Sequence, residues 1–170
     1  MKKAILSLLM IISVIAGSGQ IYEEQAKTVF SKFKNTTEVA QYIYYNLPTL
    51  EECRYVFKDA IADTFYNKIN ASKVTLEQLK EIPEQTFEGV KIQTFSSDDV
   101  IAERGNTNGG MTGIKNVFRP GIIFYKVSFL KKKEDEYGIA YKYFIFINSR
   151  WVFFPKPYAI LPKEKYNDEE

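Results

Sequence analysis

Hydrophobic residues in the first half of the chain recur every three to four positions, which is the spacing of one face of a helix. This pattern predicts helices at residues 22–33, 38–46, 50–69 and 76–82. Capping boxes, in which side chain and backbone exchange hydrogen bonds across the first turn, mark two of the helix starts. These boxes are Thr49 with Glu52 and Thr75 with Gln78, and Thr37 is the expected cap of the helix at 38–46.

After Pro83 the hydrophobic period changes to two, which is typical of strands. Strands are expected at residues 90–94, 121–130, 138–147 and 151–154, and a short one can be drawn at 100–103. The glycine-rich residues 105–113 are expected to form a loop. The charged residues 131–136 predict one hairpin tip, and Asn148 with Ser149 predicts a second, tight hairpin.

Helices followed by strands in one chain of 170 residues predict an α+β domain. We expect N-terminal helices packed on a curved antiparallel sheet of about four to five strands. The two long strands are apolar at nearly every position, so both faces of the sheet have to be covered. The helices are expected on one face, and the other face requires curvature, a partner subunit or a ligand.

Residues 1–19 have the three parts of a secretory signal peptide, namely a basic start, an apolar stretch at 4–15 and small residues at 16–19. The apolar stretch is shorter than the roughly 20 residues that a transmembrane helix needs. We therefore expect cleavage after Ser18 or Gly19, and a periplasmic or secreted product without stable membrane insertion. An uncleaved N-terminal anchor is the alternative.

The remaining chain is expected to form one domain at residues 20–162, followed by a charged flexible tail at 163–170. The whole chain has 23 basic and 21 acidic residues. Because Lys2 and Lys3 lie in the signal segment, their removal leaves a formally neutral domain. A neutral domain has no electrostatic reason to bind nucleic acid, so no nucleic-acid partner is expected.

The last hairpin has a recognisable pattern. Residues 143–154, YFIFINSRWVFF, run from one strand through a short polar turn into a strand that begins with tryptophan. With the helices placed before the sheet, this resembles the ketosteroid-isomerase-like (cystatin-like) cone domains, and the chain also resembles small exported bacterial proteins of unknown function. The resemblance implies helices on a curved sheet, but no catalytic residue, because such folds host many functions.

The chain has no histidine, which excludes Ser-His-Asp and Cys-His catalysis and histidine-ligated zinc. No metal and no cofactor are expected. Cys53 lies in an apolar helical stripe and is interpreted as a core residue. The pair Asp59 and Asp63 is interpreted as a solvated helix face. The acids Asp98, Asp99 and Glu103 lack the spacing of a calcium-binding loop, and residues 105–113 lack the ending of a phosphate-binding loop.

Aromatic residues are abundant, with 12 tyrosines and 13 phenylalanines. If several lined one concave sheet face, they would form an apolar cavity with hydroxyl groups, suited to a small amphipathic ligand. The alternative is that they pack in the core, because aromatic residues favour strands. The candidate ligand-binding residues are Tyr42, Tyr45, Tyr125, Tyr141, Tyr143 and Trp151.

These observations predict an exported, non-catalytic α+β domain that binds a small ligand or a protein partner through an aromatic-rich sheet face. The first alternative is a cone-fold enzyme, an isomerase or a hydrolase-like protein, that uses a buried carboxylate and a tyrosine hydroxyl in an apolar pocket. The second alternative is a structural homodimer whose subunits bury the second sheet face between them.

Overall fold

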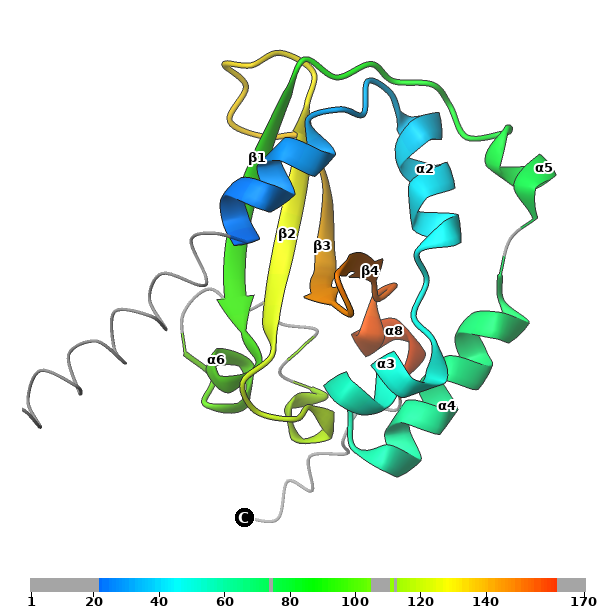
Figure 1. Ribbon diagram of the computed structural model, residues 1–170, viewed down its shortest axis with the longest axis vertical. Helices are drawn as coiled ribbons and strands as arrows, with labels where there is room; N and C mark the ends of the chain where they lie inside the picture. The colour runs from blue at the N-terminus through cyan, green and yellow to red at the C-terminus, as the bar shows by residue number, and fades with distance from the viewer. Residues whose placement is uncertain (1–21, 74, 105–110, 112, 162–170) are drawn as a thin grey trace, which may run out of the picture.

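The computed structural model describes residues 22–73, 75–104, 111 and 113–161. The predicted signal segment, the predicted tail and most of the glycine-rich loop lie outside the described residues. An open, four-stranded antiparallel sheet and the helices around it form an α+β fold, so the predicted fold class is confirmed (Figure 1). None of the described helices combines the length and the apolar character needed to cross a membrane.

The strands follow one another in the sheet in chain order, as a simple meander. They are β1 (Gly89–Ser96), β2 (Ile123–Leu130), β3 (Ile139–Ile147) and β4 (Arg150–Phe153). The predicted tight hairpin joins β3 to β4, where Ile147 pairs with Arg150 across a two-residue turn. Asn148 and Ser149 both have positive φ, 52° and 60°, as a type I′ turn requires.

A bulge in β3 changes which face its side chains reach. Tyr125 pairs with Phe144, but Val127 pairs with Tyr141, so β3 has one extra residue between these pairs. Strict alternation predicts that Tyr141 and Tyr143 share a face. This prediction is wrong, because the extra residue places Tyr141 on the face of Phe144 and leaves Tyr143 on the opposite face.

The first two predicted helices are present with small changes. The N-terminal helix is described over residues 22–30, and α2 spans Thr36–Tyr45. The predicted cap of α2, Thr37, is wrong: the Asn35 side chain accepts the hydrogen bond from the Glu38 amide. Thr36 is instead buried, and its hydroxyl donates to the Pro83 carbonyl at 2.8 Å, which ties α2 to the segment before β1.

The predicted helix at 50–69 is two helices, α3 (Leu50–Val56) and α4 (Asp59–Ala71). Phe57 between them has extended backbone and pairs with Phe118 in an antiparallel bridge. The Arg119 side chain donates to the Arg54 and Phe57 carbonyls and so satisfies the end of α3. The stripe of apolar residues continues through the break, which is why its spacing did not reveal the break.

Two short helices, α6 and α8, were not predicted from the sequence. The pattern predicts a strand in the region of α6 and no helix or strand in the region of α8. The strand drawn at 100–103 is wrong, because α6 (Ser97–Ile101) occupies this region. A capping box of Ser96 with Asp99 starts α6 directly at the end of β1. Beyond β4, α8 (Pro157–Ile160) follows with a proline in its first turn.

The predicted start of α5 (Leu76–Leu79) at Thr75 and both predicted capping boxes are confirmed.

Helices of the same chain cover both faces of the sheet, so the expectation that all helices lie on one face is wrong. On one face the N-terminal helix and α2 pack against β2, β3 and β4 through the ring of Phe30 and its neighbours. On the other face α3 and α4 pack through Phe57, Phe65 and Cys53. Ser97, at the start of α6, connects this helix to the residue before β2, because its hydroxyl accepts a hydrogen bond from the Ile122 N–H at 2.9 Å.

The β3–β4 turn gives a stability prediction. Ser149→Gly is expected to raise the free energy of unfolding by about 0.5–1 kcal/mol, because glycine adopts positive φ without the strain of a Cβ atom. Urea denaturation measures the change. Ser149→Ala is the control, since it removes the hydroxyl and keeps the strain, and it is expected to give no gain. Equal effects of both substitutions would contradict the strain argument.

Candidate functional site

An apolar hollow of about 780 Å³ lies between α2, α5, β3 and α8. A smaller hollow of about 190 Å³ adjoins it and shares five lining residues with it. We call the two hollows together the apolar groove. The larger hollow is lined by Ala40, Ile43, Leu79, Ile82, Ile139, Ala140, Tyr141, Lys142, Tyr143, Phe153, Pro155, Lys156, Tyr158, Ala159 and Ile160. Its volume lies within the range of roughly 300–1,000 Å³ that ligand pockets occupy.

The groove exists because β4 is shorter than β3. β4 pairs only with Phe144–Ile147, the last part of β3. The Phe154 amide still donates to the Tyr143 carbonyl at 2.9 Å, but the chain then turns away through Pro155 and Lys156 into α8. Lys68 on α4 donates to the Ile160 carbonyl at 2.9 Å and holds α8 in place. The first part of β3 therefore borders the groove and does not pair with β4.

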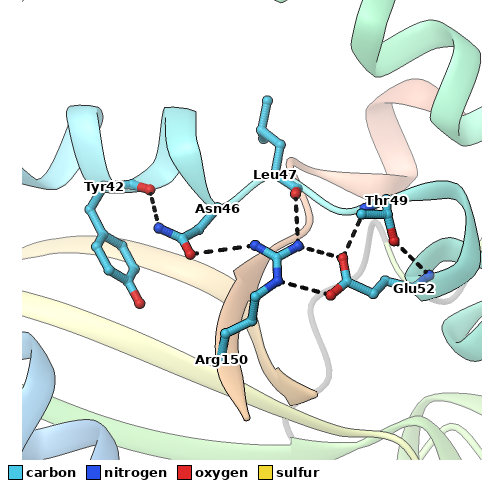
Figure 2. A network of polar contacts seen from close by, with 6 residues as sticks. All are labelled: Tyr42, Asn46, Leu47, Thr49, Glu52 and Arg150. Carbon is cyan, nitrogen blue, oxygen red and sulfur yellow. Dashed lines mark hydrogen bonds and ion pairs between the residues drawn. The ribbon is translucent and has the colours of Figure 1, made fainter. Parts of the chain in front are cut away.

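A buried ion pair fixes the end of α2, which forms one wall of the groove (Figure 2). Arg150, at the start of β4, donates from Nε and Nη2 to the two Glu52 oxygens at 3.0 and 2.5 Å. The same guanidinium donates to the Leu47 carbonyl at 3.3 Å and to Asn46 Oδ1 at 3.4 Å. The end of α2, the start of α3 and the start of β4 thus meet at one side chain.

Glu52 has two roles in this contact. It belongs to the capping box of α3, where one carboxylate oxygen accepts from the Thr49 amide at 2.8 Å. Its side chain is only 2% exposed, against 31% for Arg150. Burial by itself would raise the pKa of the Glu52 carboxyl, but the hydrogen bonds and charge of Arg150, with the Thr49 amide, outweigh burial and lower this pKa below its ordinary value. The carboxylate is therefore charged at neutral pH.

The six candidate ligand-binding residues do not gather in one place. Tyr42, Tyr125, Tyr141 and Trp151 belong to the core face that contains Phe30, whereas Tyr143 lies on the opposite face. Tyr45 is 67% exposed, and its ring packs edge-on against Tyr44. Only Tyr141 and Tyr143 line the apolar groove, where the edge of β3 brings the two faces together.

The tyrosines inside the core are packed, with neutral hydroxyl groups. The Tyr125 and Trp151 rings are in edge contact with centroids 4.8 Å apart. Burial, with a smaller contribution from Glu23 and Tyr22, raises the pKa of Tyr125 to about 12. Burial also raises the pKa of Tyr42, against the charge of Arg150, and that of Tyr141. In the groove, the Tyr141 hydroxyl therefore remains a neutral hydrogen-bond group at physiological pH.

Cys53 is fully buried on the inner face of α3, which agrees with its interpretation as a core residue. Burial, and then the charge of Glu52, raises its thiol pKa to about 12. The acidic residues of α4 are in exposed ion pairs, Asp63 with Arg54 and Asp59 with Arg119. This agrees with the interpretation of a solvated helix face.

The second acidic cluster has structural partners. Asp99 belongs to the capping box at the start of α6, and its hydrogen bonds with Ser96 lower its pKa. Asp98 accepts from the Gly121 amide at 3.1 Å, and Glu103 pairs with Lys115. Within the described residues, no three side chains of the metal-binding types lie close enough together to hold an ion.

The enzyme alternative predicts a carboxyl group whose pKa is raised by burial in a pocket. Two carboxyl groups of the described chain, Glu52 and Asp99, have pKa values that depart clearly from the ordinary range, and both values are lowered. Among the described residues Glu52 is the one buried carboxylate, and it is occupied by Arg150 and by the capping box. The contacts of Glu52 and Asp99 thus serve the helix starts and the ion pair described above.

Comparison of the chain with protein-family models gives no match, and comparisons with curated proteins and with solved structures give none either.

The buried ion pair gives a prediction with a defined pH dependence. Arg150→Met is expected to lower the free energy of unfolding by about 3 kcal/mol at pH 7, because it leaves the Glu52 carboxylate buried without its partner. A lowered native pKa means that the wild-type pair stabilises the fold above the unfolded-state pKa of about 4.3, and that this contribution is lost as the pH falls through the native pKa. Urea denaturation at pH 7 and at pH 3 should therefore show a smaller difference between variant and wild type at pH 3.

Arg54→Met is the matched control for this measurement. The pair of Arg54 with Asp63 is about half exposed on both sides, so its loss is expected to cost less than about 1 kcal/mol at pH 7. Similar small losses for both variants would show that the contact of Arg150 with Glu52 is not a major constraint on the fold.

Proposed function

We propose that the protein is an exported, non-catalytic α+β domain that binds a small ligand in the apolar groove. The observation that carries this proposal is the groove itself, a hollow of about 780 Å³ lined mainly by aliphatic and aromatic side chains with tyrosine hydroxyls among them. Mostly apolar hollows with a few polar groups are the usual form of small-molecule sites. Both sheet faces are covered by helices, so the ligand site lies at the edge of β3.

The other large hollow has a different character. It measures about 680 Å³ and lies between α3 and the β3–β4 turn. Four of its five charged lining residues are already in ion pairs: Arg54 pairs with Asp63, Arg119 pairs with Asp59, and Glu52 is bound by Arg150. Filling it would require a ligand to compete with these contacts, whereas the apolar groove offers surface that gains from being removed from water.

The export and the finer fold assignment are parts of the same proposal. Export rests on the three-part N-terminal sequence, and it places the domain in the periplasm or outside the cell. A ketosteroid-isomerase-like architecture is supported by the order of the elements, helices before an antiparallel meander that ends in the hairpin with Trp151. The homodimer alternative was based on a sheet face that a second subunit would cover. Helices of the same chain cover that face.

A groove-filling substitution tests the binding site. Ala140 is exposed on β3 and lines the groove, so Ala140→Trp is expected to fold normally and to occupy the hollow. The probe is Nile red, a neutral dye whose fluorescence rises in apolar surroundings. Wild type is expected to bind it, and Ala140→Trp to weaken binding at least about tenfold, since a buried aromatic side chain takes up much of the apolar surface.

Ala60→Trp is the matched control. Ala60 is also exposed, but it lies on α4 and lines none of the hollows described above. This variant is expected to bind Nile red as wild type does. Equal binding by both tryptophan variants, or no binding by wild type, would contradict the groove as the ligand site.

The export part has its own test. The full chain is expressed in a Gram-negative bacterium, and the intact mass of the protein is measured after cell fractionation. The expected product lacks the first residues up to Ser18 or Gly19 and is found outside the cytoplasm. A protein that retains Met1 and stays in the cytoplasmic fraction would contradict export, whatever the groove binds.

A further inference from the structure

The two outer edges of the sheet differ in how well they are covered. At one edge β4 is four residues long, and the Phe153 amide on its outer side donates to the Asn46 carbonyl at 2.9 Å. At the other edge β1 is eight residues long, and within the described part of the chain no strand pairs with its outer side (Figure 1). β1 is therefore the open edge of the sheet.

Alternate residues of β1 direct their backbone groups away from β2. The Ser97 amide, just beyond the strand, donates to the Ile122 carbonyl at 2.8 Å, so the amides of the odd-numbered residues point toward β2. The Ser96 amide points the other way and donates to the Asp99 carboxylate at 3.3 Å. The remaining outward amides and carbonyls belong to Val90, Ile92 and Thr94.

The β1 strand lacks the features by which proteins usually protect an exposed edge, namely short length, a proline, a bulge or several charges. Its pairing with β2 runs without a shift from Gly89 to Ser96. It contains no proline, and Lys91 is its single charged residue. An edge of this kind offers its backbone groups to a further strand.

The sequence of β1 is complementary to itself when two copies run antiparallel about Ile92. In this register Ile92 lies opposite Ile92 of the second copy, and Val90 lies opposite Thr94, so all the outward residues form hydrogen-bonded pairs. Val90 and Ile92 are only partly buried on the face that contains Phe30. Contacts between β-branched side chains across the two strands would cover them further and stabilise the pair.

The same register keeps like charges apart. On the opposite face, the exposed Lys91 would lie beside the exposed Gln93 of the second copy, which can accept a hydrogen bond from it. Centring the pair on Lys91 would bring two lysines together. Centring it on Gln93 would set Val90 against Ser96, whose amide already has its partner.

We propose that the partner of this edge is a second copy of the chain, which adds its own β1 and joins two four-stranded sheets into one continuous sheet. The contact is symmetric, because the same residues pair from both copies. It goes beyond the proposed function, since no β1 residue lines the apolar groove. An edge contact buries less surface than a stable dimer does, so the dissociation constant is expected on the order of 10–100 μM.

Sedimentation velocity tests the proposal on the protein recovered from the cell fractionation described above. Its mass is expected to rise toward that of a dimer between about 1 μM and about 1 mM. Gln93→Glu sets a carboxylate opposite Lys91 twice in each dimer and is expected to lower the dissociation constant about tenfold. Within one copy, Lys126 donates to the Gln93 side chain at 2.9 Å, and Gln93→Glu keeps an acceptor for it.

Reversing the charges checks the register. Gln93→Lys sets like charges opposite each other and is expected to raise the dissociation constant about tenfold. Combining it with Lys91→Glu places opposite charges across the interface again, so dimerisation is expected to return to wild-type strength or better. Ala60→Glu and Ala60→Lys are the matched controls, because they change the net charge equally at an exposed residue of α4, and neither should alter the constant.

Amide exchange measured by NMR at low and high protein concentration identifies the paired residues. The amides of Val90, Ile92 and Thr94 are expected to exchange at least about tenfold more slowly in the dimer, because pairing gives them partners. The amides of Gln93 and Phe95, which point toward β2, should be protected at both concentrations. A dimer in which the outward amides exchange as fast as in the monomer would overturn the proposal.

The charge variants give two further results that would overturn it. The first is that wild type and Gln93→Glu both sediment as monomers at about 1 mM. The second is a dimer whose strength does not depend on the charge at residue 93, or which the double variant fails to restore, because such a dimer uses another surface or another register. The gain expected from Gln93→Glu cannot come from damage to the fold.

Discussion

Burial of both faces of the two central strands is the constraint on which the other features depend. The ring of Phe30 contacts Phe144 and Trp151 on one face, with centroid distances of 4.6 and 5.6 Å. On the other face, Phe57 contacts Phe65 and Phe154 at 4.8 and 5.9 Å. Each buried aromatic side chain removes roughly 150–250 Å² from water, so neither face could be left exposed without a large loss of stability. The helices are distributed between the faces for this reason.

Covering two faces with short helices leaves an edge that is not fully closed. α2 packs on the Phe30 face but also extends past the sheet toward α5, and β4 ends before it reaches the first half of β3. The bond between Arg150 and Glu52 keeps the end of α2 at a fixed place relative to β4. The groove is thus a consequence of how the layers are joined, and its wall is held by a contact outside the groove itself.

Local signals in the sequence predicted the elements well, and contacts distant in sequence account for the errors. The capping boxes at Thr49 and Thr75 and the tight turn at Asn148 depend on a few neighbouring residues, and the structure has all three. The break at Phe57 depends on pairing with Phe118, some sixty residues away, and the stripe of apolar residues runs through it. The β3 bulge likewise depends on the register with β2, so alternation alone places Tyr141 on the wrong face.

Only part of the candidate site could be predicted from the sequence. The excess of aromatic residues in the sequence points to β3 among other elements, and Tyr141 and Tyr143 of this strand line the groove. The remaining lining comes from α2, α5 and α8, whose approach to one another is set by packing and not by any local pattern. The ion pair of Glu52 with Arg150 joins residues that are 98 positions apart in the chain, and no sequence motif predicts it. The capping box did identify Glu52, but it gave no sign of the guanidinium that shares its carboxylate.

The burial of Cys53 has a consequence for the reactivity of its thiol. Burial raises the pKa of this thiol to about 12, so the thiol stays protonated at pH 7, and the side chain is also closed off from solvent. Disulfide exchange proceeds through the thiolate, so this sulfur reacts only when α3 comes away from the sheet. Under the proposed export, this chain with its single cysteine would thereby escape accidental cross-linking to its neighbours for as long as it stays folded.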